Sequence, residues 1–86
     1  MEFSFSAHAL EQIKRRNLSQ ELIEEVLNNP DYILDTGKLK VFQSIIEMEQ
    51  TTKHLLRVFV NMEKIPALVV TVYKTSKIEK YHEGKI

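Results

Sequence analysis

The first thirty residues contain two stretches in which apolar side chains recur at helical intervals. Leu10 and Ile13 lie three positions apart with Ala9 beside them, which predicts a helix over about residues 7–16 with these side chains buried. In the second stretch the apolar residues form one stripe, and glutamates occupy the other side. The stripe consists of Leu22, Ile23, Val26 and Leu27. We therefore predict two amphipathic helices.

Polar residues at the ends of these stretches have side chains that start and stop helices. Ser6 and Ser19 each precede a helical stretch, where a hydroxyl accepts a hydrogen bond from a free backbone N–H. Asn17 ends the first helix because it tolerates the left-handed backbone conformation. Pro30 ends the second, since proline disfavours a helical conformation in the residue before it.

From Asp31 onward the pattern changes toward a period of two, which predicts strands. The four predicted strands cover residues 32–35, 39–48, 53–62 and 66–74. Their connections are too short for parallel crossovers and favour an antiparallel meander. The expected fold class is therefore α+β, with two N-terminal helices packed on one face of a four-stranded antiparallel sheet. We expect a single domain over residues 1–86 with a tail that frays from about residue 76.

Alternation in the last two strands assigns their side chains to two faces of the sheet. The aliphatic face is expected to meet the helices. The predicted core consists of Leu10, Ile13, Leu22, Val26, Val58, Val60, Val70 and Val72. The other face displays a cation, two aromatic rings and a hydroxyl group, namely Arg57, Phe59, Tyr73 and Thr71. Such residue types bind phosphates and stack on bases, although an ordinary half-exposed sheet face accounts for the same pattern.

Composition narrows the class of protein. The chain of 86 residues has 12 basic and 12 acidic side chains and no cysteine, which excludes disulfides, thiolate zinc sites and cysteine nucleophiles. No apolar run approaches the ~20 residues of a membrane helix, so we expect a cytoplasmic protein without a membrane partner. Residues 1–52 have five basic and nine acidic side chains, whereas residues 53–86 have seven and three. This asymmetry suits a polyanionic ligand on the basic half, or pairing between the halves within the molecule.

His8 is the histidine that the pattern places best for chemistry. It falls on the first predicted helix with Gln12 and Arg15 on the same side. An imidazole beside a guanidinium suits acid–base catalysis on a phosphodiester, because histidine gains and loses a proton near neutral pH. A solvent-exposed histidine on a charged helix face explains the same positions. No histidine pair has the i, i+4 spacing of a helical metal site, so we expect no metal and no cofactor.

Several short motifs follow one another along the chain in an order that resembles a known family. They are Phe5-Ser6-Ala7-His8-Ala9, Arg15-Arg16, Asn17-Leu18-Ser19, Val26-Leu27-Asn28-Asn29-Pro30, Thr36-Gly37 and Val70-Thr71-Val72-Tyr73. Their order and spacing over about residues 3–75 carry the resemblance to the family called domain of unknown function 4258. That family's helix more often ends in Arg-Gly-Ile-Ser. Here Asn17-Leu18 replaces Gly-Ile, which affects a turn and no chemical group.

The family is similar to the toxin-like ribonucleases of bacterial toxin–antitoxin modules, of the RelE, ParE and BrnT type. The resemblance implies helices set before a curved antiparallel sheet, and it implies RNA cleavage. By position it suggests His8, Arg57 and Tyr73 as catalytic residues, of which His8 and Tyr73 lie in matched motifs. The RNA-binding residues expected around them are Arg15, Phe59, Thr71 and Lys74.

Two hypotheses about function follow from these expectations. In the first, the protein is a toxin-like, metal-independent endoribonuclease of a toxin–antitoxin module. Its expected partners are RNA, including ribosome-bound mRNA, a small antitoxin protein and a second copy of itself in a homodimer. Arg57 would stabilise the charge of the transition state, with His8 as acid or base and Tyr73 as stacking platform or acid. In the second hypothesis, the same fold is a non-catalytic module that binds protein or RNA.

Overall fold

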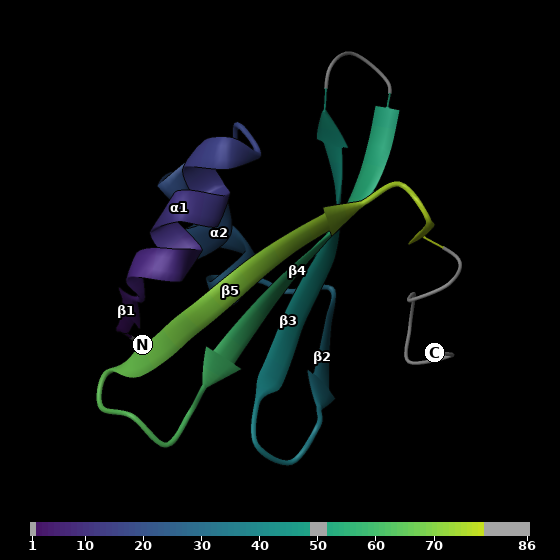
Figure 1. The fold of residues 1–86 in the computed structure, drawn as a ribbon. Coiled ribbons are helices and arrows are strands. Elements are labelled where there is room, and N and C mark those ends of the chain that lie inside the picture. The colour runs from purple at the N-terminus through teal and green to yellow at the C-terminus, as the bar shows by residue number, and fades with distance from the viewer. Residues whose placement is uncertain (1, 49–51, 79–86) are drawn as a thin grey trace.

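In the residues that the structure describes, 2–48 and 52–78, five strands form one sheet and both helices pack on the same face of it (Figure 1). The structure is a computed structural model. In chain order the elements are β1 (Phe3–Phe5), α1 (Ala7–Arg15), α2 (Gln20–Asn28), β2 (Tyr32–Asp35), β3 (Lys40–Met48), β4 (Thr52–Asn61) and β5 (Ala67–Thr75). The order of the strands across the sheet is β1-β5-β4-β3-β2. The first and last strands in sequence are therefore neighbours.

The four-stranded antiparallel sheet predicted from the sequence is wrong. β1 adds a fifth strand, which runs parallel to β5 and pairs Phe3 with Ala67 and Phe5 with Val69, so the sheet is mixed. Short connections link only β2 to β5, and these four strands do pair antiparallel in succession. β1 reaches β5 through both helices and three strands, and a connection of that length permits parallel pairing. A strand of three residues is also too short for its alternation to be recognised.

Ser6 begins α1 as the sequence predicts, and it also fixes the helix beside β5. Its Oγ accepts a hydrogen bond from the Ala9 N–H at 3.0 Å. Its own N–H donates to the Val69 carbonyl oxygen at 2.9 Å, and its hydroxyl donates to the Val70 carbonyl oxygen at 3.1 Å. One side chain therefore caps the helix and links it to the sheet.

The other predicted helix boundaries are confirmed as well. Asn17 has a left-handed conformation with φ of 59° directly after the C-cap of α1. Ser19 Oγ accepts a hydrogen bond from the Leu22 N–H at 3.0 Å and so caps α2. α2 ends at Asn28, two residues before Pro30. Local capping chemistry is thus sufficient to set where each helix starts and stops.

The core lies between the helices and the sheet and contains most of the predicted residues. The buried cluster consists of Ala9, Ile13, Ile23, Val26, Leu27, Phe42, Leu56, Val58, Val60, Ala67, Val69 and Val72. Leu22 packs against this cluster, but Leu10 is 44% exposed. Ala9 and Ile13 are four positions apart and define the buried side of α1, whereas Leu10 is rotated by about 100° from Ala9.

A β-bulge removes Val70 from the predicted core. Val60 pairs with Val69, and the preceding residue of β4 pairs with Thr71, which leaves Val70 without a partner in the ladder. Alternation therefore changes phase within β5, so that Val69 faces the helices before the bulge and Val72 faces them after it. The sequence prediction assumed that side chains alternate without a break along β5, and it therefore placed Val70 in the core instead of Val69.

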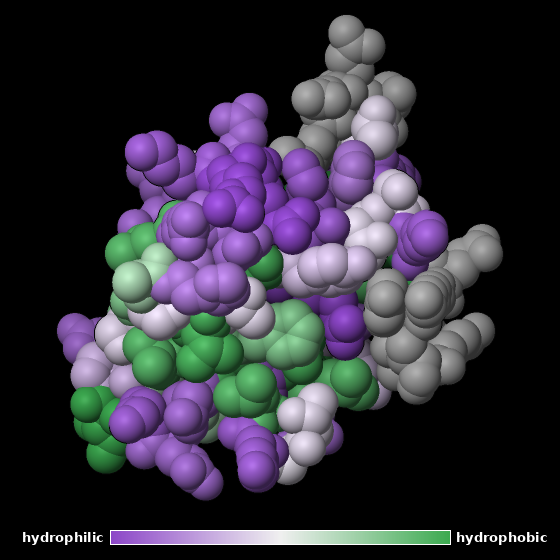
Figure 2. All heavy atoms as spheres, viewed as in Figure 1, coloured by the Kyte–Doolittle hydropathy of each residue, from purple (hydrophilic) through white to green (hydrophobic). Residues whose placement is uncertain are grey.

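The surface is divided between polar and apolar regions. Figure 2 shows hydrophilic side chains gathered at the top of the molecule, over the helices, and a mainly hydrophobic band below them. Across residues 2–48 and 52–78, no helix has the length and apolar character needed to span a membrane. The tail predicted to fray from about residue 76 lies, from residue 79 onward, outside the described residues.

Candidate nucleic-acid interface

Four residues on four successive strands lie in one row across the sheet. Tyr32 on β2 pairs with Gln43 on β3, Gln43 with Arg57 on β4, and Arg57 with Tyr73 on β5. Residues that pair directly across strands project to the same face. Arg57 alternates along β4 with two residues of the helix-side core, so the row lies on the face turned away from the helices. We call these four residues the polar row. At ~4.8 Å per strand, the row spans about 14 Å.

Mainly apolar residues border the polar row on both sides. Toward the β4–β5 turn the neighbouring row consists of Leu34, Val41, Phe59 and Thr71, and on the other side it consists of Ile45, Leu55 and Thr75. Val41 is 0% exposed and Leu55 is 1% exposed. Hydrogen bonds and charge interactions are stronger in such surroundings than in bulk water. The polar row is therefore a strip of polar groups set into an apolar face.

Contacts with two neighbours orient the side chain of Arg57. Its Nε donates a hydrogen bond to Gln43 Oε1 at 3.1 Å, and Gln43 is 1% exposed. The guanidinium carbon lies 5.3 Å from the centre of the Phe59 ring, which is within cation–π distance. The Nη atoms are the donors that match two phosphate oxygens at once. The contacts with Gln43 and Phe59 therefore fix how the guanidinium of Arg57 is oriented on this face.

A second arginine reaches the polar row from α1. Arg16 is the C-cap residue of α1, and its guanidinium carbon lies 5.8 Å from the centre of the Tyr73 ring. Its Nε donates a hydrogen bond to Gln12 Oε1 at 3.0 Å. The first three residues of β5 pair with β1, and α1 also packs against β5. Tyr73 is therefore next to two arginines, Arg57 across the strand pair and Arg16 from the helix.

Lys74 lies on the helix side of the sheet. It follows Tyr73 in β5, and its Nζ donates a hydrogen bond to the carbonyl oxygen of Arg16 at 3.5 Å. An ammonium group near the last carbonyls of a helix also complements the helix dipole. This hydrogen bond therefore links Lys74 to the C-terminal end of α1, where Arg16 lies.

Two other residues predicted from the sequence lie on α1, apart from the polar row. His8 is exposed, two turns before Arg16 and thus roughly 12 Å from it along the helix axis. Arg15 forms an ion pair with Glu11 at 3.1 Å on the exposed side of α1. The structure brings four of the predicted residues together on one face, namely Arg57, Phe59, Thr71 and Tyr73.

Sequence reasoning missed three residues of this face: Gln43, Tyr32 and Arg16. The signal for Gln43 was its place opposite Arg57 in the β3–β4 hairpin, since a buried amide needs a hydrogen-bond partner. Arg16 follows His8 and Gln12 at intervals of eight and four, which places the three on one side of a helix. Tyr32 required the register between β2 and β3, which alternation alone does not fix.

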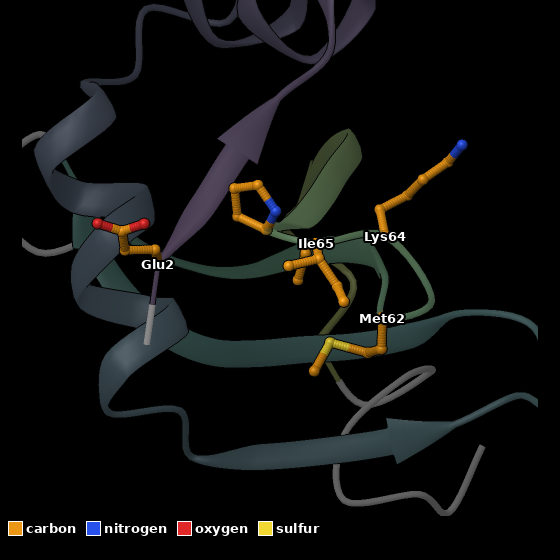
Figure 3. A pocket seen from close by; sticks show the side chains of 6 residues that line it. Glu2, Met62, Lys64 and Ile65 are labelled. Carbon is orange, nitrogen blue, oxygen red and sulfur yellow. The ribbon is translucent and has the colours of Figure 1, made fainter.

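A pocket of about 470 Å³ lies elsewhere, near the β4–β5 turn. Its lining residues are Glu2, Met62, Lys64, Ile65, Pro66 and Ala67 (Figure 3). Ile65 is 98% exposed, and Lys64 extends away from the other labelled side chains in Figure 3. Of the described residues that line this pocket, Glu2 and Lys64 are charged, and their side chains do not point toward one another (Figure 3). Among the described residues, no three histidine, aspartate or glutamate side chains gather in a way that could hold a metal ion.

Comparison with known proteins identifies one family. A family model described as Domain of unknown function (DUF4258) matches residues 5–74, a range that contains every motif used above for the resemblance. No curated protein and no solved structure matches the chain. These comparisons do not link the chain to RelE, ParE or BrnT toxins, so the toxin-like activity stays a prediction.

Proposed function

The chain belongs to the DUF4258 family, and from the geometry of its polar row we propose that it binds single-stranded RNA and cleaves it without a metal ion, as a toxin-like endoribonuclease. One observation carries this proposal. Arg57, oriented by the buried amide of Gln43, lies opposite Tyr73, and a second guanidinium from Arg16 lies over the Tyr73 ring. Cations that match phosphate oxygens therefore adjoin an aromatic ring on which a base can stack.

The proposed reaction uses the ribose 2′-OH as nucleophile. Its oxygen forms a bond to the neighbouring phosphorus, the bond to the 5′-oxygen breaks, and the product ends in a 2′,3′-cyclic phosphate. Water accepts the proton of the 2′-OH, and the Tyr73 hydroxyl donates a proton to the departing 5′-oxygen. Arg57 stabilises the additional negative charge on the phosphorane in the transition state.

His8 stays a predicted acid or base in this scheme. It lies roughly 12 Å from Arg16 along the axis of α1, whereas Tyr73 belongs to the polar row itself. We therefore assign the proton transfer closest to that phosphate to Tyr73, which pairs directly with Arg57.

The experiment is a cleavage assay with purified protein, 5′-labelled single-stranded RNA and EDTA. We expect cleavage at an unchanged rate in EDTA, fragments that end in 2′,3′-cyclic phosphate, and no cleavage of 2′-O-methyl RNA. Arg57→Ala should slow cleavage by about 10²–10³-fold, as expected for the loss of one preorganised charge. Arg15→Ala is the matched control, because Arg15 is exposed and paired with Glu11. Equal rates for wild type and Arg57→Ala would assign the activity to a contaminant.

The position of His8 favours a second candidate function, which is RNA binding without cleavage. In that case wild-type protein retains labelled RNA in a binding assay but leaves it intact, and its production in a bacterial host is harmless. A ribonuclease should instead slow growth or translation. A small antitoxin that covers the polar row with its own carboxylates should relieve this effect.

A further inference from the structure

The β4–β5 turn combines a protruding apolar side chain with a hollow beside it. Ile65 is 98% exposed, and it lines the pocket of about 470 Å³ at this turn. Two other lining residues belong to the fold's interior, since Met62 packs against the core and Ala67 is 7% exposed. We call the six residues that line this pocket the turn patch. It is an apolar surface that another apolar surface can cover.

Two opposite charges flank the apolar side chains of the turn patch. Glu2 and Lys64 lie on opposite sides of Ile65 and Met62 (Figure 3). Within residues 2–48 and 52–78, neither of these charges takes part in an ion pair. The turn patch therefore has a negative end, an apolar centre and a positive end. Such a surface is complementary to a copy of itself that is turned by 180°.

We propose that the turn patch is the contact between two copies of this chain in a two-fold symmetric dimer. Ile65 of each copy enters the hollow of the other, and Glu2 of each copy lies opposite Lys64 of the other. A two-fold axis through the apolar centre exchanges the two ends of the turn patch, so it brings unlike charges together twice. This inference goes beyond the proposed function and does not depend on RNA binding.

A second copy fits the turn patch better than a small molecule does. Pockets for small molecules have a few polar groups that converge on the ligand, whereas the side chains of Glu2 and Lys64 diverge (Figure 3). Ile65 is almost fully exposed, so it is removed from water only by a partner that has a hollow to accept it. Every copy of the chain carries such a hollow beside Ile65.

The size of the turn patch indicates a weak dimer. Its six residues are far fewer than the about 20–30 residues that each partner contributes to a standard interface. We therefore expect a dissociation constant of about 10–500 μM, which makes the protein monomeric in dilute solution and dimeric at high concentration.

Sedimentation equilibrium across this range of concentrations measures the dimer directly. Ile65→Asp should weaken dimerisation by at least about 100-fold, because the symmetry repeats the loss of apolar burial in both copies. Leu10→Asp is the matched control, because Leu10 is also exposed, at 44%, but lies on α1. It should dimerise like wild type. Circular dichroism confirms that each variant is folded.

The two charges allow a test that only a contact between copies can pass. Lys64→Glu and Glu2→Lys should each weaken dimerisation by about 3- to 30-fold, since each places like charges opposite one another. An equimolar mixture of the two variants should dimerise like wild type, because both pairs in the mixed dimer again consist of unlike charges. Pairing of Glu2 with Lys64 within one chain would give no such rescue.

Three results would contradict the proposed dimer. A wild-type protein that stays monomeric up to about 1 mM would overturn it and leave the turn patch to a different occupant. A dimer that Ile65→Asp does not weaken would overturn it as well, and absence of rescue in the mixture would overturn the two-fold arrangement. Cleavage of RNA by a strictly monomeric protein would overturn this inference alone, whereas a dimer with these properties that binds no RNA would overturn only the proposed function.

Discussion

On the helix side of β4, Leu56, Val58 and Val60 are fully buried against the helices. On the other side of the same strand Leu55 is buried as well, but Arg57 and Phe59 are only half-buried. These three side chains on the helix side of β4 are all aliphatic, and other aliphatic side chains of similar size would fill the same space. The other side holds a guanidinium, an amide and two phenol rings in one row at a defined register. Burial on the first face supplies the stability that lets the second face keep polar groups within an apolar border.

The largest effect is expected on the helix side, where the bulge provides a direct comparison. Val69→Asp buries an unpaired charge in the core and should cost several kcal/mol, against a total stability of only about 5–15 kcal/mol for a typical domain. Val70→Asp places the same charge at a half-buried bulge position and should cost much less. Urea unfolding of the two variants measures the difference. Equal destabilisation would contradict the change of phase within β5.

The next effect concerns Gln43, which connects the two faces because it is buried and yet belongs to the polar row. Gln43→Leu removes the acceptor for Arg57 Nε and should lower stability by about 1–3 kcal/mol. If Gln43 orients Arg57 for the transition state, kcat should fall by at least about tenfold while KM changes little. Gln43→Glu keeps an acceptor but adds a negative charge, so it should weaken RNA binding more than it lowers stability. An unchanged kcat in Gln43→Leu would show that Gln43 has only a structural role.

Arg15 and Arg16 are neighbours in sequence but lie in different surroundings, since Arg16 lies over the Tyr73 ring and Arg15 pairs with Glu11. Arg16→Ala removes the cation over the Tyr73 ring and should weaken RNA binding by about 3- to 30-fold at low salt. Arg15→Ala should change binding by no more than about twofold, because Arg15 pairs with Glu11 on the exposed side of α1. A titration with labelled RNA at two salt concentrations distinguishes them. The reverse ranking would show that RNA lies along the outer side of α1 instead of on the polar row.

The smallest effect is expected for His8. From its position two turns before Arg16, His8→Ala should lower the cleavage rate by only about two- to fivefold, through a contact with a neighbouring nucleotide. A loss of about 10²–10⁴-fold is the value expected for a general acid or base. Single-turnover rates for wild type and His8→Ala distinguish these two ranges. A loss in the larger range would show that His8 acts as an acid or base at the reacting phosphate.

Sequence patterns were sufficient where structure depends on neighbouring residues. Local hydrogen bonds and backbone preferences set the helix ends, and these boundaries were predicted correctly from Ser6, Asn17, Ser19 and Pro30. Alternation in β4 was also sufficient to place Arg57 and Phe59 opposite the core, because the strand continues regularly up to the bulge. Local periodicity is reliable over such stretches.

Features that depend on pairing between distant segments were not predicted. β1 forms a strand only because β5 lies next to it, more than sixty residues later in the sequence. The bulge at Val70 and the place of Tyr32 opposite Gln43 are properties of register, which a single strand's sequence does not contain. Arg16 was missed for a similar reason, since its contact with Tyr73 depends on how α1 packs beside β5.

On this proposal RNA is bound on the polar row, on the face of the sheet turned away from the helices. Amide chemical shifts of isotopically labelled protein, recorded during titration with six-nucleotide 2′-O-methyl RNA, show where on the protein the RNA binds. We expect the largest changes at Tyr32, Gln43, Arg57 and Tyr73, with smaller changes at Arg16 and none around Ile65. Changes confined to α2 or to the pocket at the β4–β5 turn, or no changes at saturating RNA, would contradict binding on the polar row.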